Sequence, residues 1–232
     1  MSVADQNSGT KITEKRSVPR LLLGLEQFRL SKMGKLFSLC DLSPKGMAFW
    51  ISPTEDQGQF SVGLMLEGII NLMRQKYPVK ARVRRLSRDR VGCEFEDISS
   101  ELALAITELM NPVRIGQELK PRPGLQKGKI WYQGPAGTDL LLLRSLDGQY
   151  QSLTLSVLNS FIQWESEEGL FTAQIQSSGQ SGPVQGIVRL ETLELEKDQT
   201  PDPTKLSIAK TVILSSKLPL ELKNWCTRKL SL

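Results

Sequence analysis

Residues 76–84 read KYPVKARVR, and this stretch decides the fold class of the first half of the chain. Apolar and charged residues alternate along it, so that one side carries Tyr77, Val79, Ala81 and Val83. Such alternation is typical of a β-strand with one buried face. The pattern continues on both sides, at residues 59–67 and 91–95, which predicts a sheet of neighbouring strands.

Working outward, three more short strands are predicted at 21–30, 35–40 and 47–51. A helix is then expected from Ser99 or Ser100, either of which can cap it, to the break at Asn111-Pro112. Leu102, Ile106 and Leu109 would form its buried stripe. About six short strands followed by one helix predict a small six-stranded β-barrel with a C-terminal helix.

The second half of the chain is also predicted to be rich in β-structure. Strands are expected at 129–133, 138–146, 150–157, 160–165, 169–176, 186–196 and 207–215, with a last helix from Pro219. Asp147-Gly148 is a two-residue hairpin signal. The whole chain is therefore expected to be mainly β, with a second β-rich domain that ends in a helix.

The domain boundaries follow from composition. Two prolines and a glycine in KPRPG, residues 120–124, are typical of a linker, and the first residues are polar without periodicity. The prediction is a flexible arm at 1–14, a barrel domain at 15–118, a linker at 119–128 and a domain of unknown role at 129–232.

The composition excludes several classes of site. The 232 residues include no histidine and only three cysteines, which are far apart. His-dependent triads, imidazole metal sites, zinc clusters and disulfide frameworks are thus disfavoured, and we expect neither an enzyme nor a metal or cofactor. The polar start lacks a signal peptide and no stretch has the length of a membrane span, so the protein is expected to be cytoplasmic.

Two short motifs carry the functional hypothesis. The first is Arg16-Ser17-Val18-Pro19-Arg20, and the second is Asp41-Leu42-Ser43-Pro44-Lys45-Gly46, which we expect to form a tight turn. Guanidinium forks bind phosphates or the O6/N7 edge of guanine. A carboxylate accepts protons from the N1/N2 edge, a serine hydroxyl adds a contact, and a glycine admits a flat ligand.

In these two motifs the sequence resembles the PilZ family, whose pattern is R-x-x-x-R, a strand hairpin and then D/N-x-S-x-x-G. Gly92 to Phe95 is similar to a later Gly-x-x-Phe element of the family, and the resemblance covers about residues 13–115. It implies a six-stranded barrel that binds cyclic di-GMP. The ligand-binding residues implied are Lys15, Arg16, Arg20, Asp41, Ser43 and Gly46.

Other interpretations remain open. An unknown protein partner would receive the signal, and the main alternative is a PilZ-like adaptor that works by protein contacts without a ligand. The basic stretch 74–90 is a nucleic-acid surface only on a third interpretation, which we disfavour because few aromatics interleave with its charges. Trp50 is expected to point outward, either as a partly buried surface residue or as a stacking surface for guanine.

Overall fold

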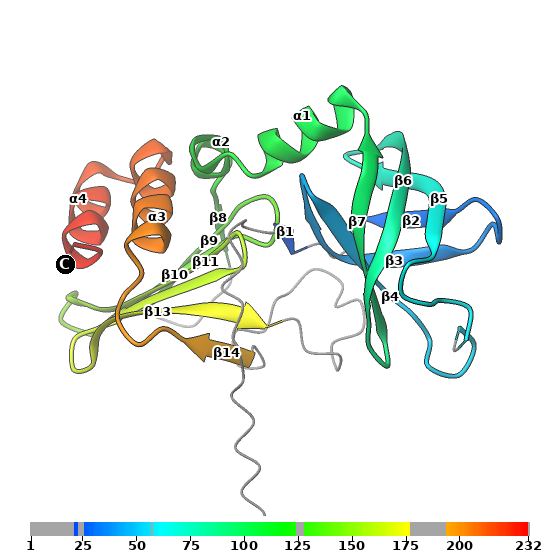
Figure 1. Ribbon diagram of the computed structural model, residues 1–232. Helices are drawn as coiled ribbons and strands as arrows, with labels where there is room; N and C mark the ends of the chain where they lie inside the picture. The colour runs from blue at the N-terminus through cyan, green and yellow to red at the C-terminus, as the bar shows by residue number, and fades with distance from the viewer. Residues whose placement is uncertain (1–20, 23–25, 57, 124–127, 177–193, 232) are drawn as a thin grey trace, which may run out of the picture.

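The computed structural model describes residues 21–22, 26–56, 58–123, 128–176 and 194–231. Within these residues the chain forms two β-sheets and four helices, with the first sheet at one end of the molecule and the second at the other (Figure 1). The chain is mainly β, as the sequence predicts. None of the described helices combines the length and the apolar composition that a membrane span requires.

The first sheet is a closed six-stranded barrel. Its strands are β2 (Gln27–Leu30), β3 (Leu36–Ser43), β4 (Gly46–Trp50), β5 (Met65–Leu72), β6 (Gln75–Leu86) and β7 (Arg90–Ile98). They run antiparallel in the order β3-β2-β5-β6-β7-β4, and β4 pairs back with β3 to close the ring. A two-residue strand, β1 (Leu21–Leu22), adds to β3 beyond the end of β2. The predicted barrel is confirmed.

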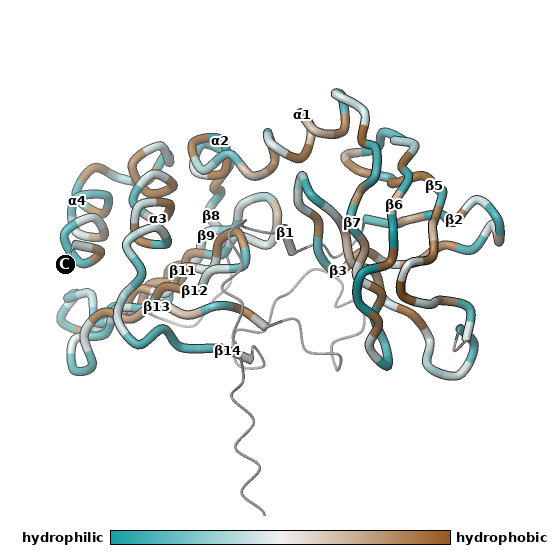
Figure 2. Tube along the Cα trace, in the orientation of Figure 1, coloured by the Kyte–Doolittle hydropathy of each residue, from teal (hydrophilic) through white to brown (hydrophobic). Residues whose placement is uncertain are grey.

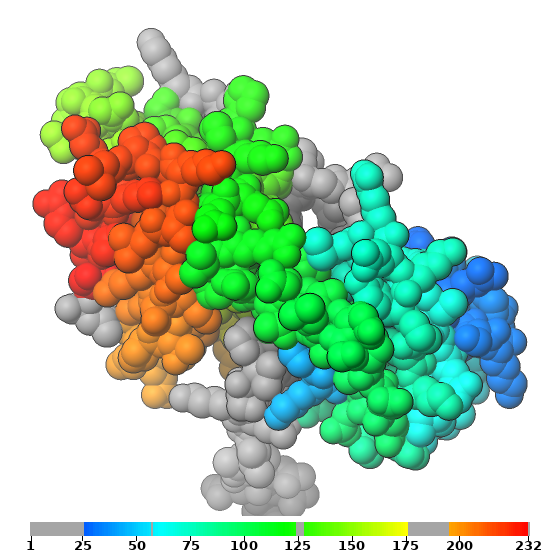
Figure 3. All heavy atoms as spheres, turned by 90° about the horizontal axis from the view of Figure 1, so that it is seen from above, coloured from blue at the N-terminus to red at the C-terminus, as the bar shows by residue number. Residues whose placement is uncertain are grey.

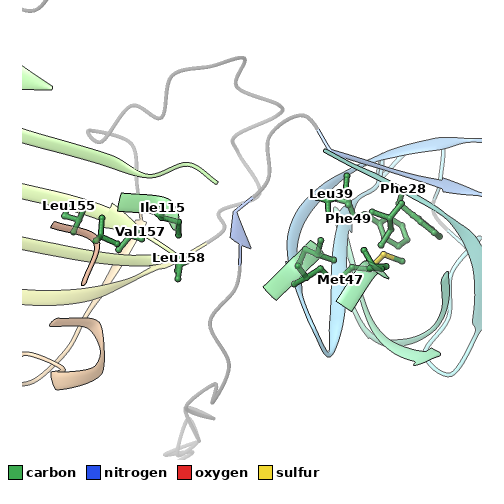
Figure 4. Close-up of a cluster of buried hydrophobic side chains, with 14 of the residues drawn as sticks. Phe28, Leu39, Met47, Phe49, Ile115, Leu155, Val157 and Leu158 are labelled. Carbon is green, nitrogen blue, oxygen red and sulfur yellow. The ribbon is translucent and has the colours of Figure 1, made fainter. Parts of the chain in front are cut away.

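Alternation along the strands builds the core of the barrel. On β6, Tyr77, Val79, Ala81 and Val83 are all buried, as the opening stretch of sequence predicts. Four phenylalanine rings pack together in the core: Phe28, Phe37, Phe49 and Phe60. The centroids of contacting rings are 5.1–5.7 Å apart. Part of this cluster is drawn in Figure 4. Such a ring cluster favours one packed arrangement of the strands around it.

Two consecutive helices lead out of the barrel. α1 (Ser100–Leu109) is capped by the Ser99 side chain, which accepts a hydrogen bond from the Leu102 amide. Asn111-Pro112 ends α1 as predicted, but it also starts a second helix, α2 (Pro112–Gln117), because the Asn111 side chain caps it and proline suits its first position. Seen from above, residues 100–117 run from the barrel towards the C-terminal helices (Figure 3).

The second sheet is a seven-stranded antiparallel meander. Its strands are β8 (Lys120–Arg122), β9 (Lys129–Gln133), β10 (Asp139–Arg144), β11 (Tyr150–Val157), β12 (Ser160–Glu165), β13 (Gly169–Gln176) and β14 (Glu194–Lys197), in chain order. The Asp147-Gly148 hairpin joins β10 to β11. Residues 120–122 of the expected linker thus pair with β9 as an edge strand.

Two strand predictions are wrong. The strand expected at 59–67 begins only at Met65, the first residue of β5. Residues 207–215 lie in α3 (Pro203–Ser215), which precedes the last helix, α4 (Leu220–Lys229). Leu206, Ala209 and Val212 recur at helical spacing and are buried. Both helices lie over one face of the second sheet, and Figure 2 shows apolar residues on the strands beneath them.

Candidate functional site

The described part of the site is the second motif, and it lies in strands more than in a turn. Asp41 and Ser43 belong to β3, and Gly46 is the first residue of β4, so the turn is limited to Pro44 and Lys45. Our expectation of a tight turn over 41–46 is wrong in this respect. Lys15, Arg16 and Arg20 lie outside the described residues.

Asp41 and Ser43 face away from the barrel core. Leu42 and Met47 are fully buried core residues that pair across β3 and β4. The residues on either side of them along each strand therefore point to the outer face. On that face Asp41 lies opposite Ala48 and Ser43 lies opposite Gly46. Both polar side chains are nevertheless enclosed, with 3% and 2% of their surface exposed.

A floor of small residues extends from Asp41 and Ser43 across the outer face. Its members are Gly46, Ala48 and Gly92: on the far side of β4, Ala48 pairs with Gly92 of β7, and Gly46 pairs with Glu94. None of these three carries a side chain larger than methyl; Gly46 and Ala48 are buried and Gly92 is partly exposed. A flat ligand can approach such a floor more closely than one lined by long side chains.

The structure gives Gly46 a packing role of its own. A Cβ atom at this position would overlap the carbonyl oxygen of Cys93 on β7, so only glycine lets β4 come this close. The Ser43 hydroxyl donates to the Gly46 carbonyl oxygen at 3.3 Å, which closes the turn. Ser43 therefore closes the β3–β4 hairpin, and Gly46 lets that hairpin pack closely against β7.

The strand β1 brings the N-terminal segment alongside this hairpin. Leu22 pairs with Asp41 and Leu21 with Leu42, in antiparallel register. Leu21 directly follows the first motif in sequence. Leu21 and Leu22 are thereby paired with the strand that carries Asp41 and Ser43.

Most of the basic residues on β6 are neutralised by their neighbours. Arg82 and Arg84 donate to Glu96 and Glu94 on β7 at 2.5 and 2.6 Å, and Lys80 pairs with Glu67 at 2.9 Å. All of these side chains are at least one-third exposed. The pattern is that of a solvated, charge-balanced face and argues against a nucleic-acid surface there.

Arg90 was not among the predicted site residues, although it lies on the same outer face of the barrel as Asp41. The pKa of the Cys40 thiol is raised to about 12, mainly by burial; the Asp41 carboxylate contributes to the rise and the Arg90 guanidinium opposes it. Both charged groups therefore act on the Cys40 thiol. The alternation of β7 indicates that Arg90 points outward. Its pairing with Trp50 could not be predicted in this way, because it depends on the register between two distant strands.

No group of three or more metal-ligating side chains occurs in the part of the chain that the structure describes. The outer face of the barrel instead brings together the Asp41 carboxylate, the Ser43 hydroxyl, the small-residue floor and Arg90.

Comparison with known proteins places the barrel in a family. The family model of the PilZ domain matches residues 16–111. A solved structure, the PilZ domain with c-di-GMP of YcgR from Escherichia coli, is 17% identical; the match covers 41% of this chain and 88% of that chain, with a TM-score of 0.34. No curated protein matches the chain. Residues 16–111, which span the closed barrel and α1 and contain both sequence motifs, thus match the PilZ domain model.

Proposed function

We propose that the chain is a cyclic di-GMP receptor in which the PilZ domain binds the ligand and the second domain passes the signal to a protein partner. One observation carries this proposal. The PilZ motif residues Asp41 and Ser43 lie together on the outer face of the barrel, next to the strand that follows the Arg16–Arg20 motif.

Each proposed contact has a chemical reason. The Asp41 carboxylate accepts hydrogen bonds from the N1/N2 edge of one guanine, and the Ser43 hydroxyl lies two residues further along β3, on the same face. Arg16 and Arg20, with Lys15 beside them, would bind phosphates and guanine. Gly46 contributes through the floor of small residues on which the ligand would rest.

The burial of Asp41 and Ser43 adds a mechanistic step. Because both are almost fully enclosed, a guanine reaches them only after chain beside the hairpin moves. A ligand that binds the opened arrangement alone shifts the equilibrium towards it. Binding and conformational change would then be coupled, as a receptor requires.

The output belongs to the second domain. By the family resemblance, it would contact a partner in the control of motility, pili, secretion or surface polysaccharide, in the cytoplasm and without catalysis. A cyclic dinucleotide is the ligand, and no metal or cofactor takes part.

One observation favours a second candidate, a PilZ-like adaptor that works without a ligand. Ser43 closes the β3–β4 hairpin and Gly46 lets it pack closely against β7, which are roles that they would also have in a domain that binds nothing. Binding measurements separate the two candidates.

Isothermal titration of the full chain with cyclic di-GMP is the test. We expect micromolar affinity or better, about −8 kcal/mol. Asp41→Asn should weaken binding by about 1–3 kcal/mol, because the amide loses the charge and one acceptor while keeping the shape of the side chain.

Glu67→Gln is the matched control. It makes the same chemical change on β5, which neighbours neither β3 nor β4, and its carboxylate is exposed. Its affinity should equal that of the wild type. A folded wild-type protein that gives no heat with cyclic di-GMP would favour the adaptor.

A further inference from the structure

Trp50 and Arg90 form a directly paired couple on the same outer face as Asp41. Trp50 ends β4, Arg90 begins β7, and the two residues are register partners. Phe49 and Val91, their neighbours along each strand, are fully buried in the core. Trp50 and Arg90 therefore point outward, as the small residues of the floor do.

Their position places them within reach of one bound dinucleotide. Ala48, which lies opposite Asp41, is two residues before Trp50 on β4. That spacing is about 7 Å along the strand, with one strand spacing of about 4.8 Å between β3 and β4. Trp50 is only partly buried, so part of its ring is open to a ligand.

Arg90 differs from the other strand arginines whose partners are described above. Arg82 and Arg84 are committed to carboxylates, whereas the Arg90 guanidinium makes no ion pair or hydrogen bond with the described residues. Its contact there is with the Trp50 ring, whose centroid lies 6.0 Å from the guanidinium carbon. This distance is at the outer limit of a cation–π contact, so the guanidinium fork is held weakly.

We propose that Trp50 and Arg90 recognise the guanine that Asp41 does not hold, with Trp50 as the stacking surface and Arg90 as the donor to its O6/N7 edge. The inference rests on the proposed function and adds two specificity-determining residues to that site. An indole ring stacks on a purine, and a planar guanidinium fork matches the two acceptors of guanine. The small-residue floor connects this pair to Asp41.

Titration and tryptophan fluorescence of the full chain with cyclic di-GMP test the stacking. Trp50→Ala should lower the affinity about 5- to 100-fold, the range for loss of one base–aromatic stack. Trp50→Phe keeps a ring and should bind within a few-fold of the wild type. The ligand-induced fluorescence change should disappear in Trp50→Phe.

Trp164→Phe is the matched control. Trp164 is also partly buried and also has a cation over its ring, Lys229 at 4.0 Å, but it lies on β12 of the second sheet. This variant should keep both the affinity and the fluorescence change.

Arg90→Lys tests the guanidinium. Lysine keeps the positive charge but loses the fork, so a merely electrostatic role would leave the affinity unchanged. We expect a loss of about 10-fold, the scale of one bidentate base contact.

The outcomes separate the two proposals. A wild-type chain that does not bind cyclic di-GMP overturns the proposed function together with this inference. A binding wild type whose Trp50→Ala variant binds equally well, or whose Trp50→Phe variant keeps the fluorescence change, overturns the role of Trp50 alone. Full affinity of Arg90→Lys overturns the role of Arg90. If Trp50→Ala fails to fold, the fluorescence of Trp50→Phe decides.

Discussion

At the residue scale, Gly46 and Gly92 lie on the same outer face but under different constraints. A Cβ at Gly46 would overlap the Cys93 carbonyl oxygen, whereas a Cβ at Gly92 would lie 3.5 Å from the Arg85 Cβ, an ordinary contact. We predict that Gly46→Ala destabilises the fold by about 1–3 kcal/mol or more, the scale of overpacking.

Gly92→Ala is the control for this change. Gly92→Ala should lower the free energy of unfolding by much less than Gly46→Ala does. Urea unfolding of both variants gives the comparison. Equal stability of the two would show that β4 can move away from β7 at little cost.

Asp139 makes a pH-dependent contribution to stability. It is buried on β10, where one carboxylate oxygen accepts from the Trp131 indole at 2.8 Å and the other has no hydrogen-bond partner among the described residues. Burial raises the pKa of Asp139 above its ordinary value of 3.8, and the hydrogen bond from Trp131 opposes this rise. Since the folded state binds the proton more tightly than the unfolded chain, stability falls as the pH rises above the ordinary value.

Asp139→Asn should therefore raise the melting temperature at pH 7 and give no such gain near pH 3. Asp147→Asn gives the opposite dependence, because a hydrogen bond from Ser145 lowers the pKa of Asp147. The stabilising effect of the wild-type Asp147 carboxylate is present at neutral pH and is lost on acidification. Thermal melts of both variants from pH 3 to 7 measure the two signs.

At the element scale, the sequence predicts the strand β6 correctly but predicts a strand where the structure has the helix α3. The alternation on β6 is unambiguous because one face of this strand is buried and the other is largely exposed. In α3, the β-branched run Thr211, Val212 and Ile213 favours a strand by composition. The helix forms because Asp202-Pro203 is an N-terminal capping pair and because the spacing of Leu206, Ala209 and Val212 matches a helical turn.

The cap of α3 is testable. The Asp202 side chain accepts hydrogen bonds from the Thr204 and Lys205 amides at 2.7 and 3.2 Å. Asp202→Ala should cost about 1 kcal/mol in urea unfolding, whereas Asp202→Asn keeps a good cap and should cost little. A similar loss in both variants would point to the charge as the source of the effect.

The site was predictable only in part for the same physical reason. A local motif identifies Asp41 and Ser43, because the chemistry of their side chains is visible in the sequence. The partners that give the site its shape are distant: Gly46 packs on Cys93, and Trp50 pairs with Arg90. Strand register between such distant segments depends on the closure of the whole barrel.

At the scale of the whole molecule, the structure bears on where the second domain begins. Ile115 of α2 is fully buried, and a Cβ at Gly116 would overlap the Val212 carbonyl oxygen and the Ser215 hydroxyl of α3. α2 thus packs with the C-terminal helices. We predict that a fragment ending at residue 110 is soluble and binds cyclic di-GMP, whereas one ending at 118 exposes Ile115 and tends to associate.

Size-exclusion chromatography and titration of the two fragments check this prediction. Because the predicted barrel domain ends at 118, equal behaviour of both fragments would support that boundary. An insoluble shorter fragment would show that the two halves depend on one another for folding.

The junction of α1 and α2 also has a mechanical consequence. The chain passes from barrel to second sheet once, through Met110, Asn111 and Pro112. A ten-residue helix such as α1 is about 15 Å long, so a change of about 20° at this elbow displaces its far end by about 5 Å. Any rotation at this junction is therefore converted by the length of α1 into a translation of the barrel relative to the second sheet.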